Sequence, residues 1–146
     1  MYNTFMKIIN KRASFNYTIE EKIEAGIVLT GGEARAIRTG HINLSNSYAK
    51  VIGNEVYLVN ADVPIAGAKN YEATHMRKLL LNRREIIDLA VKMKQKKLTL
   101  VPTKAYTKGG RVKIELGLAK SKREFEKKES IKKKDIQRDL QKELKN

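Results

Sequence analysis

Basic side chains dominate the residues that could bind a ligand in this chain of 146 residues, which has 31 lysines and arginines against 16 aspartates and glutamates. The formal net charge of +15 makes a polyanion the expected partner, because a lysine or arginine placed on a phosphate releases condensed counterions. Four clusters stand out: Lys7, Lys11 and Arg12; Arg35 and Arg38; Arg77, Lys78, Arg83 and Arg84; and Lys104, Lys108, Arg111 and Lys113. One cluster alone is typical of a solvated surface. Together they favour nucleic acid, although membrane surfaces are polyanions too.

Tyrosines alternate with these clusters along the chain, at positions 17, 48, 57, 71 and 106. A tyrosine ring can stack on an unpaired base, and each such contact contributes about 1–3 kcal/mol in single-strand binders. Tyrosines in strands also pack against their neighbours without any ligand. Glu33 is an acid beside Arg35 and Arg38, and it has two readings as well. Its carboxylate either stabilises the start of a helix, or has a functional role in which it accepts hydrogen bonds from base amino groups or positions the two arginines.

Several chemistries are excluded by composition. The chain has no cysteine, so it has no disulfide, thiolate nucleophile or cysteine-bound metal. Its two histidines, His41 and His75, have polar or charged neighbours and are expected on the surface, which leaves no metal site and no hydrolase triad. We therefore expect no enzyme, cofactor or metal. No run of 18 apolar residues and no secretory signal is present, so the protein is expected in the cytoplasm without a membrane partner.

Local patterns predict short strands joined by tight turns. The expected strands are two within residues 15–30 that meet at Glu21-Lys22, then 48–52 and 56–59 around Gly53-Asn54, then 98–106 and 111–118 joined across 108–110. A short helix is expected over 33–39, with Gly40 at its C-terminal end. A second helix is expected to begin at Asn82, which can form a capping box with Glu85. Residues 62–75 are expected to form a loop. This pattern predicts a mainly β protein: an OB-like antiparallel β-barrel of about six strands with two or three small helices.

The charge and the apolar residues divide the chain into two parts. Residues 1–119 carry 20 basic and 10 acidic residues with apolar positions throughout, and are expected to form the RNA-binding barrel domain. Residues 120–146 carry 11 basic and 6 acidic residues and few large apolar ones. We expect this basic C-terminal tail to be disordered when free and helical when docked, with Ile136, Leu140 and Leu144 on one stripe.

Three stretches of the sequence are specific enough to indicate a family: ASFNYTIEEKIEAGIVLTGGEARAIRTGHINLSNSYAKV, MRKLLLNRREI and LTLVPTKAYTKGGRVKIELGLAKSKREFEKKESIKKKD. These stretches and their order closely resemble the SsrA-binding protein (SmpB) family, from about residue 7 to residue 140. The resemblance implies an OB-like barrel and a role in bacterial trans-translation. Family members bind the transfer-RNA-like domain of tmRNA and escort alanyl-tmRNA with elongation factor Tu to stalled ribosomes. The tail enters the small-subunit decoding centre and the empty mRNA channel, and the nascent chain is then tagged for degradation. We expect a monomer.

The same resemblance assigns residues to tmRNA. Glu33, Arg35 and Arg38 match the family's G-x-E-V-K-S-L-R helix. Tyr17 falls on the aromatic before I-E-E, and residues 79–82 on the K-L-L-L-x segment. The expected tmRNA-binding residues are Tyr17, Glu33, Arg35, Arg38, Arg77, Lys78, Leu79, Leu81, Asn82 and Arg83. The expected ribosome-contacting tail residues are Lys122, Arg123, Phe125, Glu126, Lys127, Lys128, Lys132, Lys133, Lys134 and Arg138.

The chain departs from the family pattern at several of these positions. In the tail, Ser121 replaces a glycine, Glu126 replaces an aspartate and Lys128 replaces an arginine. Phe125 occupies a position that is His or Tyr in the family, and its ring can stack on a base but cannot form a hydrogen bond. A lysine lacks the bidentate fork of arginine, which changes its contact with phosphate. The family's P-x-R-x-R-K segment corresponds to residues 73–78, where Ala73 replaces the proline and His75 replaces the first arginine.

Two other classes of protein share this composition. One is a general single-stranded nucleic-acid-binding or ribosome-associated OB protein, which would use the same barrel. The other is a small RNA-modifying or RNA-cleaving enzyme, which the missing cysteine, paired histidines and clustered acids disfavour.

Overall fold

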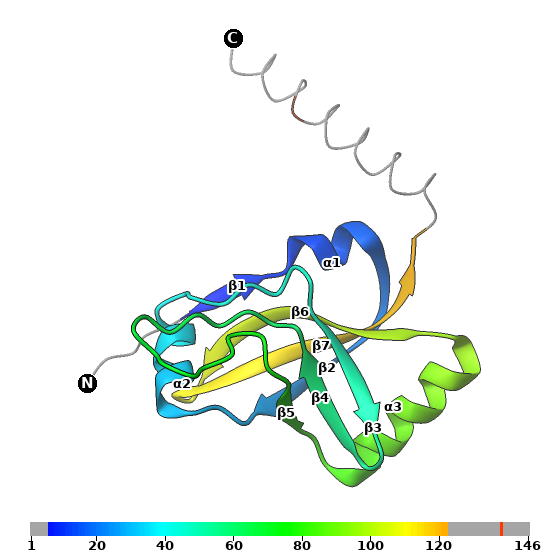
Figure 1. Ribbon diagram of the computed structural model, residues 1–146. Helices are drawn as coiled ribbons and strands as arrows, with labels where there is room; N and C mark the ends of the chain where they lie inside the picture. Colours follow the sequence, from blue (N-terminus) through cyan, green and yellow to red (C-terminus); the bar gives the residue numbers. More distant parts are fainter. Residues whose placement is uncertain (1–5, 123–137, 139–146) are drawn as a thin grey trace.

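The computed structural model describes residues 6–122 and Arg138 of the chain, and Figure 1 shows its arrangement. The elements in chain order are β1 (Lys7–Ile9), α1 (Lys11–Asn16), β2 (Tyr17–Ile27), α2 (Gly31–Arg38), β3 (Tyr48–Ile52), β4 (Glu55–Val59), β5 (Arg77–Leu80), α3 (Arg83–Lys96), β6 (Thr99–Lys108) and β7 (Arg111–Ser121). No helix among these residues is long and apolar enough to cross a membrane.

The strands form one antiparallel sheet that closes on itself. Around the ring the order is β2, β5, β4, β3, β6 and β7, and β7 pairs with β2 to complete it. β1 lies outside this ring on β6, where Ile8 pairs with Ala105. The expected OB-like antiparallel barrel is thus confirmed, and residues 6–122 contain seven strands, where about six were expected, with three helices around them.

The two strands expected within residues 15–30 are one strand, so that prediction is wrong. β2 runs unbroken from Tyr17 to Ile27, and its pairing with β7 shifts register between Ile19 and Glu21. A β-bulge inserts one residue and bends the strand without ending it. The polar pair Glu21-Lys22 therefore lies next to a bulge, where the sequence suggested a chain reversal.

The predicted turns and helix ends are confirmed. β3 and β4 pair around Gly53-Asn54, and β6 and β7 pair across Gly109-Gly110, whose φ angles of 58° and 76° fit a two-residue hairpin turn. α3 begins after Asn82 with the expected capping box to Glu85. α2 begins two residues earlier than predicted, at Gly31, because Thr30 caps it. Three elements were not predicted: β1, α1 and β5.

An aliphatic core fills the barrel and extends under two of the helices. Alternate residues of the strands point inward, and Leu58, Leu100, Ile114 and Leu116 are fully buried. α2 and α3 lie at opposite ends of the barrel (Figure 1), and each contributes buried side chains: Ile37 from α2, and Ile86 and Leu89 from α3. The barrel thereby fixes the position of α2 relative to β5, on which the candidate site depends.

Candidate nucleic-acid interface

α2 begins with a reciprocal pair of hydrogen bonds. The Glu33 backbone N–H donates to Thr30 Oγ1 at 3.2 Å, and the Thr30 backbone N–H donates to Glu33 Oε1 at 2.9 Å. Two of the four free N–H groups at the start of the helix are satisfied in this way. The helix-start reading of Glu33 is therefore confirmed, and only one of its carboxylate oxygens is used for it.

The second oxygen of Glu33 binds Arg77 inside the protein. Arg77 Nε donates to Glu33 Oε2 at 2.6 Å, and each residue is only 1% exposed. A guanidinium has five N–H donors. The other four of Arg77 bind the backbone oxygens of Ala61 (2.8 Å), His75 (3.1 Å) and Ala73 (2.8 Å) and the hydroxyl of Tyr71 (2.9 Å). All five donors are thus satisfied, and Arg77 has none left for RNA.

These contacts fasten the long loop between β4 and β5, residues 60–76, to the barrel and to α2. Ala61 lies at its start and Ala73 and His75 near its end, so Arg77 joins the two ends of the loop. His75 Nε2 lies 2.8 Å from Glu33 Oε2, and the Tyr71 hydroxyl donates to the Val63 carbonyl oxygen at 2.7 Å. The expectation of His75 as a plain surface residue is incomplete, because its half-exposed ring contacts a buried carboxylate.

The protonation of Glu33 depends on this network. Burial raises the pKa of its carboxyl, but hydrogen bonds from the Thr30 backbone, Arg77 and His75, with the charge of Arg77, outweigh burial and lower that pKa from 4.5 to about 2. The carboxylate therefore remains charged at any pH at which the protein would meet RNA.

The remaining predicted tmRNA-binding residues are distributed between the surface and the interior. Arg35, Arg38, Lys78, Asn82 and Arg83 are exposed. Arg38 Nη2 donates to the Gly110 carbonyl oxygen at 2.7 Å, and Lys78 pairs with Glu55 at 3.4 Å. Leu79 is fully buried, Leu81 is half-buried against the core, and Tyr17 is half-buried beside Ala13.

Leu80 is an exposed residue of the 79–82 segment that is absent from the expected tmRNA-binding residues. β5 alternates inward and outward, so Arg77 and Leu79 point in while Lys78 and Leu80 point out. Leu80 is 52% exposed and lies over Gly26 of β2, where an added Cβ would meet Leu80 Cβ at 3.2 Å. Leu80 thus fits closely against β2 because residue 26 has no side chain. The alternation is a signal that could have identified Leu80, had β5 been predicted as a strand.

Leu80 forms one wall of a cavity of about 260 Å³, here called the Leu80 groove. Its lining residues are Gly26, Ile27, Leu29, Ala34, Arg38, Leu80, Arg111, Val112 and Lys113. Three are cations and most of the others are apolar. An unpaired base can lie on an apolar wall while cations bind its phosphate, so this combination suits an RNA nucleotide.

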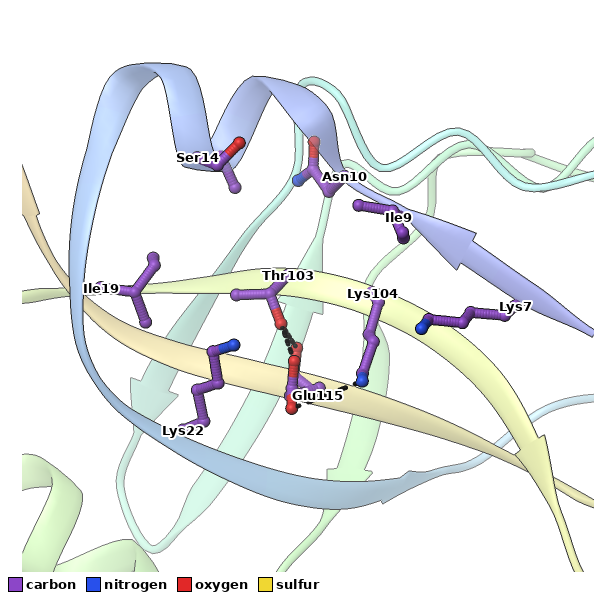
Figure 2. A pocket seen from close by; sticks show the side chains of 10 residues that line it. Lys7, Ile9, Asn10, Ser14, Ile19, Lys22, Thr103, Lys104 and Glu115 are labelled. Atoms are coloured by element: carbon purple, nitrogen blue, oxygen red, sulfur yellow. Dashed lines mark hydrogen bonds and ion pairs between the residues drawn. The ribbon is translucent and has the colours of Figure 1, made fainter. Parts of the chain in front are cut away.

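A second cavity of about 240 Å³ lies between α1, β1, β2, β6 and β7. Figure 2 shows Lys104 reaching Glu115, with the side chains of Lys7 and Lys22 also lining the cavity. The Glu115 carboxylate accepts from Thr103 Oγ1 at 2.5 Å and pairs with Lys104 at 3.8 Å. Within residues 6–122, neither Lys7 nor Lys22 has an ion-pair partner. This α1 pocket joins two of the basic clusters seen in the sequence.

The predicted tail residues lie almost wholly outside the described part of the chain. Arg123, Phe125, Glu126, Lys127, Lys128, Lys132, Lys133 and Lys134 are not described. Lys122 Nζ donates to the Ser14 carbonyl oxygen at 3.0 Å, and Arg138 is exposed. β7 continues to Ser121, two residues past the domain boundary expected at 119. Among the described residues, no three His, Asp or Glu side chains lie together as a metal site would need.

A closed antiparallel barrel with cationic, partly apolar cavities on its outer surface defines a small nucleic-acid-binding protein of OB-like architecture. The family model described as "SmpB protein" matches residues 7–146. The chain belongs to the SmpB family.

Individual relatives agree with this assignment. The SsrA-binding protein of Chloroflexus aggregans is 45% identical over 140 residues, covering 93% of this chain and 89% of the relative. That of Persephonella marina is 45% identical over 139 residues (93% and 91% covered), and that of Treponema denticola 43% over 150 residues (99% and 97% covered). A solved structure described as "tmRNA-SmpB: a journey to the center of the bacterial ribosome" matches with a TM-score of 0.69 and 37% identity, covering 86% of this chain and 94% of that one.

Proposed function

We propose that this protein is the RNA-binding adaptor of trans-translation, which binds the transfer-RNA-like domain of tmRNA and delivers it to stalled ribosomes. Family membership supports the role, as do relatives named SsrA-binding protein and a similar structure described with tmRNA and the bacterial ribosome. The protein acts as a monomer in the cytoplasm, in company with elongation factor Tu and alanyl-tmRNA. We assign it no catalytic step.

The observation that carries this proposal in the structure is the Leu80 groove. It combines an exposed leucine with Arg38, Arg111 and Lys113, and Arg35 is exposed nearby on the same helix as Arg38. We call the surface made by Arg35, Arg38, Leu80, Arg111 and Lys113 the RNA-binding face. Asn82 and Arg83 follow Leu80 along the chain, at the start of α3. Structured RNA is recognised by shape, by phosphates and by a few exposed bases, and this face offers partners for each.

The predicted residues then divide into two roles. The exposed ones, Arg35, Arg38, Lys78, Asn82 and Arg83, contact the RNA directly together with Leu80. Glu33 and Arg77 are buried and saturated with hydrogen bonds, so they act by holding α2 and the 60–76 loop in place. Leu79, Leu81 and Tyr17 support the same face from the interior and from β2.

The tail has a separate task in this proposal. Residues 120–146 enter the small-subunit decoding centre and the empty mRNA channel, where their lysines and arginines bind ribosomal RNA and their narrow apolar stripe orders as a helix. The first two of these residues belong to β7, and the barrel closes without those that follow it, so tmRNA binding and ribosome probing are separable activities.

The alternative function is general binding of single-stranded nucleic acid. The α1 pocket supports it, because Lys7 and Lys22, which have no ion-pair partner within residues 6–122, could bind any phosphate chain. A competition assay separates the two functions. The transfer-RNA-like domain of tmRNA is bound to the full chain and challenged with transfer RNA and with an arbitrary single strand. The adaptor requires that neither displaces the bound RNA at equal concentration. Displacement by the arbitrary strand at equal concentration would support the alternative.

A further inference from the structure

Both ring nitrogens of His75 face an acceptor. Nε2 lies 2.8 Å from Glu33 Oε2, and Nδ1 lies 2.9 Å from the backbone carbonyl oxygen of Met76. A carboxylate and a carbonyl can only accept, so each contact needs a proton on the nitrogen that makes it. A neutral imidazole has one such proton and an imidazolium has two. The two contacts can therefore be hydrogen bonds at the same time only when the ring is an imidazolium.

We propose that His75 is a positioning residue whose imidazolium form holds the 60–76 loop against α2, so that the RNA-binding face loses affinity when the ring gives up its second proton. The proposal rests on the proposed function for its RNA readout only. Its structural half, the doubly protonated ring, stands on the two contacts of His75.

The groups that face the ring come from three elements. Glu33 of α2 accepts from it, and Tyr71 of the 60–76 loop meets it edge to face with 5.9 Å between ring centroids. Arg77 of β5 is a cation that donates to the His75 backbone oxygen and to the same Glu33 oxygen. Glu33, with its pKa of about 2, stays charged from pH 5 upward. Within this network the ring of His75 is therefore the group whose two contacts depend on how many protons it carries.

The loop held by His75 contacts the first turn of α2. Ile65 of the loop lies against Gly32, where an added Cβ would come within 3.3 Å of Ile65 Cδ1. Arg35 and Arg38 follow on the same helix. When the ring becomes neutral, one ring nitrogen has a lone pair in place of its proton, and this lone pair faces an acceptor oxygen. The loop then loses a charge-assisted hydrogen bond. The RNA-binding face is therefore best organised when both ring nitrogens carry protons, and it loosens when a rise in pH removes one of them.

The ring itself can be measured without RNA. Nitrogen NMR of the full chain, labelled at histidine, reports whether each ring nitrogen carries a proton. We expect both His75 nitrogens to be protonated at pH 6. His41 is the matched control, because its Nδ1 contacts the Thr39 hydroxyl, which can donate or accept. A His75 ring with one unprotonated nitrogen at pH 6 and below would overturn the proposal.

RNA affinity supplies the second readout. Binding of the transfer-RNA-like domain at constant ionic strength should weaken at least about threefold from pH 6 to pH 8, the loss of one half-exposed charged hydrogen bond. His75→Arg, whose charge does not titrate, should bind with a flat profile, and His41→Gln should keep the slope of the unmodified protein. Equal slopes for the unmodified protein and His75→Arg would contradict the proposal. If no RNA binds at any pH, the proposed function fails, and the ring measurement decides this inference by itself.

Discussion

Glu33 and Arg77, 44 positions apart in sequence, form an ion pair inside the protein, with Arg77 Nε 2.6 Å from Glu33 Oε2 and each residue 1% exposed. The pair connects the first turn of α2 to β5, and through Arg77 it connects both to the 60–76 loop. Two of the residues expected to bind tmRNA are thus buried and bound to each other.

Glu33→Gln should lower the free energy of unfolding by about 3–5 kcal/mol, because it leaves the Arg77 guanidinium buried without its counter-ion. Glu85→Gln is the matched control, since Glu85 occupies the same capping-box position in α3 and is more exposed. Its loss should cost about 0.5–1 kcal/mol. Urea denaturation of the two variants measures both values. Equal losses would show that the ion pair adds nothing beyond the cap.

Acid should destabilise the protein through the same carboxyl. Because the pKa of Glu33 falls from 4.5 to about 2 on folding, its stabilisation is complete above pH 4.5 and is lost as pH falls toward 2. The loss should reach about 3 kcal/mol at most. Denaturation midpoints from pH 5.5 to pH 2.5 measure it, and Glu33→Gln should show a shallower decline. Parallel declines would contradict this assignment.

Salt dependence should reveal the phosphate contacts of the RNA-binding face. Arg38→Gln should weaken binding to the transfer-RNA-like domain and reduce the slope of log affinity against log salt by about one. Lys50→Gln changes the net charge equally from β3, which lies across the barrel from the Leu80 groove. Its slope should match that of the unmodified protein. A similar reduction in both variants would mean that Arg38 acts only through net charge.

Truncation after Lys122 should separate the two proposed activities. The barrel strands end at Ser121, so the shortened protein keeps its fold and should bind the transfer-RNA-like domain with nearly unchanged affinity. Tagging of stalled products in a reconstituted translation system should be abolished. Loss of RNA affinity in the truncated protein would contradict the division into barrel and tail.

The sequence predicted those features that depend on local chemistry. Gly53-Asn54 and Gly109-Gly110 marked their hairpins, and Asn82 with Glu85 marked the start of α3, because each signal lies within four residues. β5 has four residues, two of them basic, and its strand conformation comes from pairing with β2 and β4. Local propensity carries no information about such pairing.

The missed parts of the candidate site follow from the missed strand. Leu79 and Leu81 were predicted as contacts from the resemblance to the family's K-L-L-L-x segment. Without β5, the alternation that buries Leu79 and exposes Leu80 could not be used to choose among the residues of that segment. The Glu33–Arg77 pair joins residues on two elements whose proximity only the closed barrel creates. Neither residue type nor spacing could indicate that contact.

The central claim is that the Leu80 groove binds RNA, and one affinity comparison tests it most directly. Leu80→Ala and Ile87→Ala remove the same kind of apolar surface, since Leu80 is 52% exposed on β5 and Ile87 is 53% exposed on α3. Neither change should alter the unfolding free energy by more than about 1 kcal/mol. We predict that Leu80→Ala weakens binding of the transfer-RNA-like domain about tenfold, through loss of the contact with a base, while Ile87→Ala binds like the unmodified protein. Unchanged affinity in Leu80→Ala, or equal losses in both variants, would contradict the claim.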